Sequence, residues 1–146
     1  MESAVLSLAG STHKVFADTS YFFALLHPRD PNHEKAVEVS QAVTNLRLTV
    51  YTTWDVVVEA VALLRYRAGF DLAKIFLADI KPDLILVYPV QAERDAAIQL
   101  FLRRSRGLKL SLCDVISYTI VSTRLDWAPC LAFDADFAAL GLTVLR

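Results

Sequence analysis

Four acidic residues stand in strongly apolar surroundings, namely Asp18, Glu59, Asp114 and Asp134. Each ends or interrupts a run of apolar residues, and Glu59 is the only charge in segment 56–64. A carboxylate is rarely buried without a partner, because losing its hydration costs on the order of several kcal/mol. Several crowded carboxylates share a divalent cation most readily. The pattern therefore favours metal-dependent chemistry on a phosphoryl group.

Each acid also has a purely structural interpretation. Asp18 precedes a predicted helix and is a candidate for its N-cap, and Asp114 forms a capping-box pattern with Ser111. Asp134 would suit an ordinary turn. Glu59 lies in mid-helix, where an ion pair with a distant basic residue is the alternative. We expect its side chain to point into a covered surface. All four together are harder to explain as caps than any one alone.

Short apolar runs, typical of strands, alternate with longer helical patterns. Strands are expected at Val15–Asp18, Arg47–Tyr51, Leu84–Tyr88, Cys130–Phe133 and Leu142–Leu145. Helices are expected at Thr19–Leu26, His33–Leu46, Thr52 or Thr53 to Gly69, Phe70–Ile80, Gln91–Arg106 and Ser111–Leu125. Strands that are apolar throughout belong to sheets covered on both faces. The fold class predicted is α/β, a three-layer α/β/α arrangement with a central, mostly parallel five-stranded sheet.

The predicted sheet would bring distant acids together. Sites of parallel sheets lie at the carboxyl ends of strands, and Asp18 and Asp134 both fall at such ends. Asp114 falls in the first turn of a helix, where the helix dipole favours negative charge. We therefore expect these three acids to converge on one edge of the sheet.

The length and composition limit the classes of protein to which this chain can belong. The 146 residues fit one domain, which we place at 14–146 after an extension at 1–13, and 55% hydrophobic residues allow a large core. The net charge of −1 excludes a generally basic nucleic-acid coat. No apolar stretch approaches the roughly 18 residues of a membrane span, and Cys113 and Cys130 are expected to be reduced. We predict a cytoplasmic protein without a membrane partner.

In order and spacing, these residues resemble the PIN domain, and within it the VapC-like toxin ribonucleases. The resemblance runs from about Val15 to the C-terminus and includes Glu59 in its apolar helix. The other matching segments are Val15–Leu26, Asn32–Ala36, Leu110–Ile116 and Phe133–Gly141. One departure is Ala132, where the family often has Thr or Ser two places before the fourth acid.

The resemblance implies hydrolysis of single-stranded RNA with Mg²⁺ or Mn²⁺, hard ions that suit oxygen ligands. Asp18, Asp114 and Asp134 would form the metal shell, with Asp136 as auxiliary or alternative fourth acid. Glu59 would bind metal through water or orient the nucleophile. Ser20 would hold a metal-bound water or the phosphate, unless it is only a helix-start hydroxyl. The resemblance also implies a small antitoxin partner and a homodimer.

Basic residues are the candidates for holding the RNA backbone. The densest stretch contains Arg103, Arg104, Arg106 and Lys109 and leads into the Asp114 helix. These charges also suit a helix C-terminus, whose dipole they complement. Arg65 and Arg67, beyond Glu59, are the second candidates.

Two other functions share part of this pattern. The main alternative is a catalytically weak PIN-like module that binds RNA or a protein partner. A receiver-like phospho-acceptor would need paired acids after the first strand and a lysine at a late strand end, and the sequence has neither.

Overall fold

The computed structural model describes residues 13–145, so the expected extension at 1–13 lies outside them apart from His13. Its sheet has five strands in the order β3-β2-β1-β4-β5, and every pairing is parallel. The strands are β1 (Lys14–Ala17), β2 (Thr49–Thr53), β3 (Ile85–Val87), β4 (Cys130–Leu131) and β5 (Val144–Leu145). The predicted α/β class and five-stranded sheet are confirmed.

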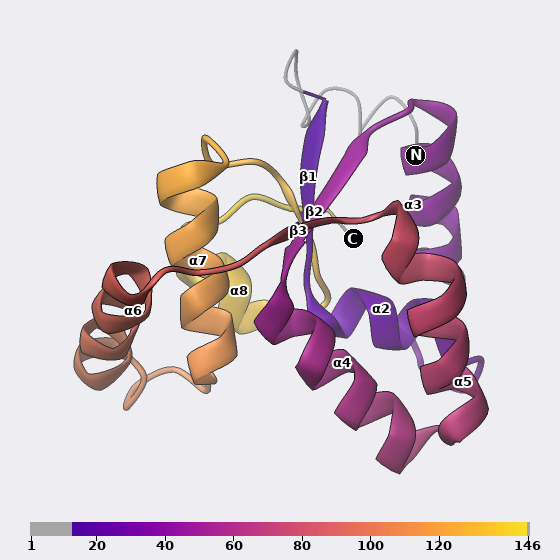
Figure 1. Ribbon diagram of the computed structural model, residues 1–146, viewed down its shortest axis with the longest axis horizontal. Coiled ribbons are helices and arrows are strands. Elements are labelled where there is room, and N and C mark those ends of the chain that lie inside the picture. The colour runs from indigo at the N-terminus through magenta and orange to yellow at the C-terminus, as the bar shows by residue number, and fades with distance from the viewer. Residues whose placement is uncertain (1–12, 146) are drawn as a thin grey trace.

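Helices cover both faces of this sheet. Figure 1 shows α2 to α5 on one side of the strands and α6 to α8 on the other. Their bounds are α2 (Thr19–Leu26), α3 (His33–Asn45), α4 (Trp54–Arg67), α5 (Phe70–Ile75), α6 (Gln91–Arg104), α7 (Leu112–Arg124) and α8 (Ala135–Ala139). A π-helical turn, Phe76–Ile80, and a 3₁₀ turn, Lys81–Asp83, follow α5. The result is the expected three-layer arrangement.

The chain reverses its direction of travel across the sheet between β1 and β4. From β1 it moves outward through β2 to β3, crosses back to β4 and continues to β5. Helices α2 and α8, which follow β1 and β4, therefore leave the sheet on opposite faces (Figure 1). Such a switch point opens a crevice at the strand carboxyl ends, where α/β proteins bind ligands. The registers Phe16↔Cys130 and Ala17↔Leu131 bring Asp18 and Asp134 to this crevice.

The apolar strands form the centre of the core. Val15, Phe16 and Ala17 of β1 and both residues of β4 are completely buried. Phe22 and Phe76 pack on one face with ring centroids 4.9 Å apart, which anchors α2 to the π-helical turn. Burying side chains of this size contributes about 2–3 kcal/mol each. This rigid core fixes where the strands end and therefore where the acids lie.

Several predicted boundaries were wrong. Strand β2 begins at Thr49, two residues late, because Arg47 adopts a left-handed turn with φ of 54°. It continues through Thr53, which both ends the strand and caps α4 by accepting from the Val56 N–H. Helix α6 ends at Arg104 instead of Arg106, and Ser105 is its C-cap.

Two further segments differ from expectation. The predicted helix over 70–80 changes to π geometry at Phe76, and Pro82 lies in the following 3₁₀ turn. The helix α8, which the sequence presented as a turn, is short and begins at the Asp134 cap. Both Cys113 and Cys130 are free thiols, as predicted. None of the described helices has the length and apolar character needed to cross a membrane.

Candidate active site

Four acids from four separate segments line one pocket at the switch point. The pocket has a volume of about 310 Å³ and contains Asp18, Thr19, Ser20, Glu59, Leu63, Lys109, Ser111, Asp114 and Asp134. Helix α7 runs back toward β4, so its N-terminus, with Asp114, lies at the edge where the strands end. The structure thus brings Asp18, Glu59, Asp114 and Asp134 together, as the sequence pattern led us to expect.

Asp18 is the most deeply buried of these acids, with 2% of its surface exposed. It caps α2: its Oδ2 accepts from the Ser20 N–H at 3.1 Å and from the Ser20 hydroxyl at 2.7 Å. Its Oδ1 is buried and has no hydrogen-bond partner. Burial raises the pKa of Asp18, and the bonds from Ser20 oppose part of that rise. One carboxylate oxygen is therefore free to bind a ligand.

Asp114 is held by the predicted capping box. Its Oδ2 accepts from the Ser111 N–H at 3.0 Å, and its own N–H donates to the Ser111 hydroxyl at 3.1 Å. Only 7% of the residue is exposed. Burial, with the negative charges of Asp18, Asp134 and Glu59, raises the pKa of Asp114 to about 7, against the lowering effect of the Ser111 bond. The acids are close enough to repel one another.

Glu59 is partly exposed instead of covered, which corrects the expectation from its apolar neighbours. Those neighbours are divided between faces of α4: Val56 and Ala60 are fully buried, whereas Val58 is 51% exposed. Glu59 lines the acidic pocket and also a second hollow that reaches Trp54 and Ile116. A mid-helix acid among apolar residues can thus face an open pocket without being buried.

The structure separates the two acids of the last motif. Asp134 caps α8, with Oδ1 accepting from the Asp136 N–H at 2.9 Å, and it lines the acidic pocket. Asp136 lies in the first turn of α8 and is not among the residues of that pocket. This geometry supports Asp134 as the direct fourth acid.

Ser20 connects two sides of the pocket. Its hydroxyl donates to Asp18 and accepts from the Phe133 N–H at 2.9 Å, one residue before Asp134. The hydroxyl proton therefore already has a protein acceptor. Thr19 and Ser111 also line the pocket; the sequence pattern identified Ser111 only as a helix cap and did not single out Thr19. The Thr19 hydroxyl is buried without a partner, and its position beside Asp18 was the only signal in the sequence.

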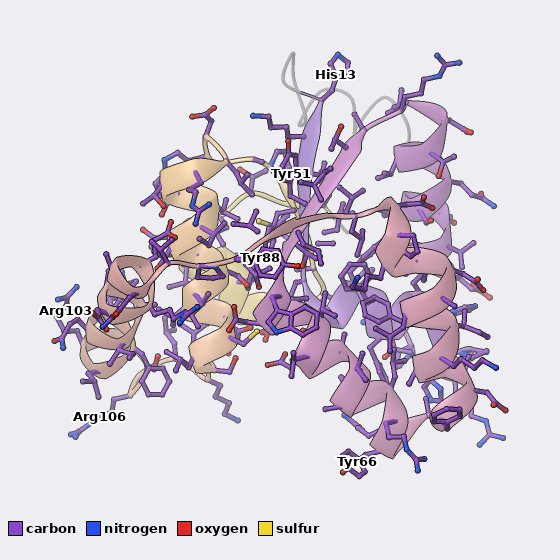
Figure 2. The ribbon with its side chains drawn as sticks, viewed as in Figure 1. His13, Tyr51, Tyr66, Tyr88, Arg103 and Arg106 are labelled. Carbon is purple, nitrogen blue, oxygen red and sulfur yellow. The ribbon has the colours of Figure 1, made fainter. Side chains whose placement is uncertain are left out.

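The predicted RNA-binding residues are dispersed. Lys109 alone among them lines the acidic pocket, and together with Arg106 it lines a neighbouring hollow beside the end of α6. Arg103 projects from the side of α6 that faces away from α7 (Figure 2). Arg104 is exposed in the last turn of the same helix. Arg65 lies over the Phe70 ring, 5.6 Å from its centroid, in a separate hollow between α4 and α5.

The pocket fits a divalent cation in its chemistry. Within residues 13–145, no salt bridge joins these four carboxylates to a lysine or arginine. Asp18 Oδ1 lacks a partner, and hard oxygen donors suit Mg²⁺ or Mn²⁺. The described residues nevertheless contain no group of three acid, His or Cys side chains already arranged to hold an ion.

Taken together, the all-parallel sheet, the switch point and the acidic pocket define an α/β domain of PIN-like fold. Among solved structures, this fold is shared by VapC20 of Mycobacterium tuberculosis, a toxin that cleaves the sarcin-ricin loop. The two chains superpose with a TM-score of 0.79 and 24% identity, over 90% of this chain and 98% of VapC20. The predicted fold is confirmed by this likeness. No family model matches the chain, and no curated protein matches it.

Proposed function

We propose that this protein is a metal-dependent endoribonuclease that hydrolyses single-stranded RNA, and that it acts as the toxin of a toxin–antitoxin pair. The observation that carries the proposal is the convergence of Asp18, Glu59, Asp114 and Asp134 on one pocket. The shared fold with VapC20, an RNA-cleaving toxin, supports the choice of RNA as substrate. We expect the protein to act in the cytoplasm.

Each side chain has a proposed role. Asp18, Asp114 and Asp134 would hold Mg²⁺ or Mn²⁺, which when bound would polarise the scissile phosphate and lower the pKa of an attacking water. Glu59, on the more open side of the pocket, would orient that water or hold it by hydrogen bonding. Ser20 keeps Asp18 Oδ2 occupied, so that the unpaired Oδ1 would be the oxygen left to bind the cation. Lys109 would attract the RNA phosphates.

RNA cleavage tests the proposed function directly. Purified protein would be incubated with Mg²⁺ and a labelled hairpin that carries the sarcin-ricin loop sequence, and with an unstructured RNA as a second substrate. The proposal predicts cuts in single-stranded segments by the wild type and no cuts by Asp114→Asn. Equal cleavage by both proteins would point to a contaminating nuclease and contradict the proposal.

A second candidate function is a catalytically weak module that binds RNA or protein. It is favoured by the absence of three pre-arranged ligand side chains in residues 13–145. The same assay separates the two functions. A weak module would bind the labelled RNA with the wild-type and Asp114→Asn proteins alike and cut it with neither.

A small antitoxin is the proposed protein partner. The hollow between α4 and α5, about 380 Å³ in volume, combines Val61, Phe70 and Leu77 with the basic residues Arg65 and Lys74. An amphipathic segment with acidic residues would complement this surface. Co-expression with the product of a short adjacent reading frame would then suppress RNA cleavage, and Phe70→Asp would restore it.

A homodimer is also proposed. Trp54, Val58, Tyr88 and Leu112, here called the apolar patch, are 44%, 51%, 60% and 39% exposed. The rings of Trp54 and Tyr88 stack with centroids 6.4 Å apart. Contiguous exposed apolar clusters of this kind often mark sites of protein–protein contact. We propose that the apolar patch of a second copy covers this one.

A further inference from the structure

The hollow that Arg106 and Lys109 share adjoins the acidic pocket and is lined by a mixture of apolar and basic side chains. It lies beside the C-terminal end of α6 and the loop 105–110, with a volume of about 390 Å³. Its apolar wall is formed by Phe101, Leu102 and Leu108, and its charges come from Arg106 and Lys109. Leu102 is 68% exposed, so this wall is open to a ligand.

Lys109 lines this hollow and the acidic pocket at the same time. The two depressions are therefore neighbours that share one cationic side chain. If a polymer placed the bond to be cleaved in the acidic pocket, the neighbouring monomer would lie in the hollow. The hydroxyl of Ser105, which also lines the hollow, is buried without a hydrogen-bond partner. A buried unpaired hydroxyl is costly, and a polar ligand group would satisfy it.

We infer that this hollow is a subsite for one nucleotide of the RNA strand, adjacent to the scissile phosphate. The inference rests on the proposed ribonuclease function. The flat apolar face of the base packs against Phe101 and Leu102, because single-stranded RNA is recognised largely by stacking on such surfaces. The flanking phosphate lies between Arg106 and Lys109. The Ser105 hydroxyl is left to bond a ribose hydroxyl or a base edge.

The chemistry of the hollow favours RNA over an acidic peptide. A peptide carboxylate would pair with Arg106 equally well, but it offers no flat aromatic group for the open apolar wall. Because Lys109 lines both depressions, the arrangement also favours a ligand long enough to enter the hollow and the acidic pocket together. Arg103, on the outer side of α6 (Figure 2), carries the same charge but lies outside the hollow. It therefore provides a matched control.

Binding is measured by fluorescence anisotropy in the Asp114→Asn background with Mg²⁺, so that the RNA stays intact. Arg106→Ala and Leu102→Asp are each expected to weaken binding about fivefold or more, whereas Arg103→Ala changes it less than about twofold. Arg106→Ala should also flatten the dependence of affinity on salt, by about one unit of slope. Thermal unfolding of each variant verifies the fold; both Leu102 and Arg106 are exposed.

RNAs with a single abasic position near the cut site complete the test. At one such position, removal of the base should weaken binding to the Asp114→Asn protein. The same removal should not weaken binding to the protein that also carries Leu102→Asp. The inference is overturned if Arg106→Ala and Leu102→Asp bind RNA as tightly as Arg103→Ala does. It is also overturned if these two variants lose affinity for an acidic peptide such as polyglutamate but not for RNA. Because binding is measured without cleavage, either result leaves the ribonuclease proposal standing. The ribonuclease proposal fails instead if the wild type does not cut RNA, or if Asp114→Asn cuts it equally well.

Discussion

Ser20 donates its hydroxyl proton to Oδ2 of Asp18 at 2.7 Å, while the same oxygen of Ser20 accepts the Phe133 N–H at 2.9 Å. One short side chain therefore joins the end of β1 to the segment that leads into Asp134. The bond also occupies one oxygen of Asp18 and leaves the other free. Ser20 is therefore a positioning residue, which ties Asp18 to the segment that leads into Asp134.

Replacing Ser20 by alanine should therefore weaken metal binding and catalysis without unfolding the protein. Loss of a residue that orients a metal ligand typically costs about 10–100-fold in metal affinity or activity. The Ser20 bond lowers the pKa of Asp18, so its removal should also shift the pH profile of cleavage to higher pH. Ser20→Thr keeps the hydroxyl and should recover most activity. An alanine variant with wild-type Mn²⁺ affinity and pH profile would contradict this role.

Asp114→Asn should abolish cleavage and preserve the fold. The amide oxygen can still accept from the Ser111 N–H, so the capping box survives, while the charge needed for the cation is lost. We expect the cleavage rate to fall by at least about a hundredfold. Asp136→Asn is the matched control, because Asp136 is outside the pocket, and it should lose less than about tenfold. Similar losses in both variants would show that the two acids share the site.

The stability of the metal-free protein should depend on pH through Asp114. Its pKa is about 7 in the folded protein against an ordinary 3.8, so the proton is held more tightly in the folded state. This contribution to stability is complete below pH 3.8, declines as the pH rises to about 7, and is constant above that. The direction follows from burial and from the three neighbouring acids.

Urea unfolding in EDTA measures this effect. Asp114→Asn cannot ionise and should match the wild type near pH 4, then exceed its free energy of unfolding on the order of 1 kcal/mol above pH 7. This figure is below the full pKa shift because the pocket is open to water, which screens the charges. A constant difference between the two proteins across this pH range would show that neither burial nor the neighbouring acids raise the pKa of Asp114.

Disruption of the apolar patch should separate the proposed dimer. Val58→Lys places a charge in the interface, and burying an unpaired charge is strongly unfavourable. The dissociation constant of the Val58→Lys dimer, measured by analytical ultracentrifugation, should be at least about tenfold higher than that of the wild type. Tyr66→Lys on the same helix is the control, because Tyr66 is 88% exposed at the far end of α4 (Figure 2). Unchanged association of Val58→Lys would place the interface elsewhere.

The sequence predicted the fold because its local signals agree with one another. Apolar strands and capping residues such as Thr53 and Ser111 act over a few positions, so their patterns can be recognised along the chain. The meeting of Asp18 and Asp134 followed from strand ends that share one edge of the sheet. The predictions that failed were those that depended on which face of a helix a side chain occupies. The apolar sequence beside Glu59 concealed an open face, and the compact basic stretch concealed that Arg103 and Arg106 point to different places.

Other features were inaccessible because they arise only from tertiary contact. Nothing near Ser20 in the sequence indicates its bond to Phe133, which is 113 residues away. The hollow shared by Arg106 and Lys109 depends on where α6 ends, and the sequence placed that end two residues too late. Residue identity predicted the kind of chemistry, whereas packing decides which residues carry it out.

The central claim is that bound Mg²⁺ or Mn²⁺ relieves the mutual repulsion of Asp18, Glu59, Asp114 and Asp134 and so enables RNA hydrolysis. The most direct measurement is the initial rate of cleavage of one labelled single-stranded RNA, first in excess EDTA and then after Mn²⁺ is added back. The wild type should cleave no RNA in EDTA and recover fully with Mn²⁺, whereas Asp18→Asn should not recover. Full activity of the purified protein in excess EDTA would contradict it.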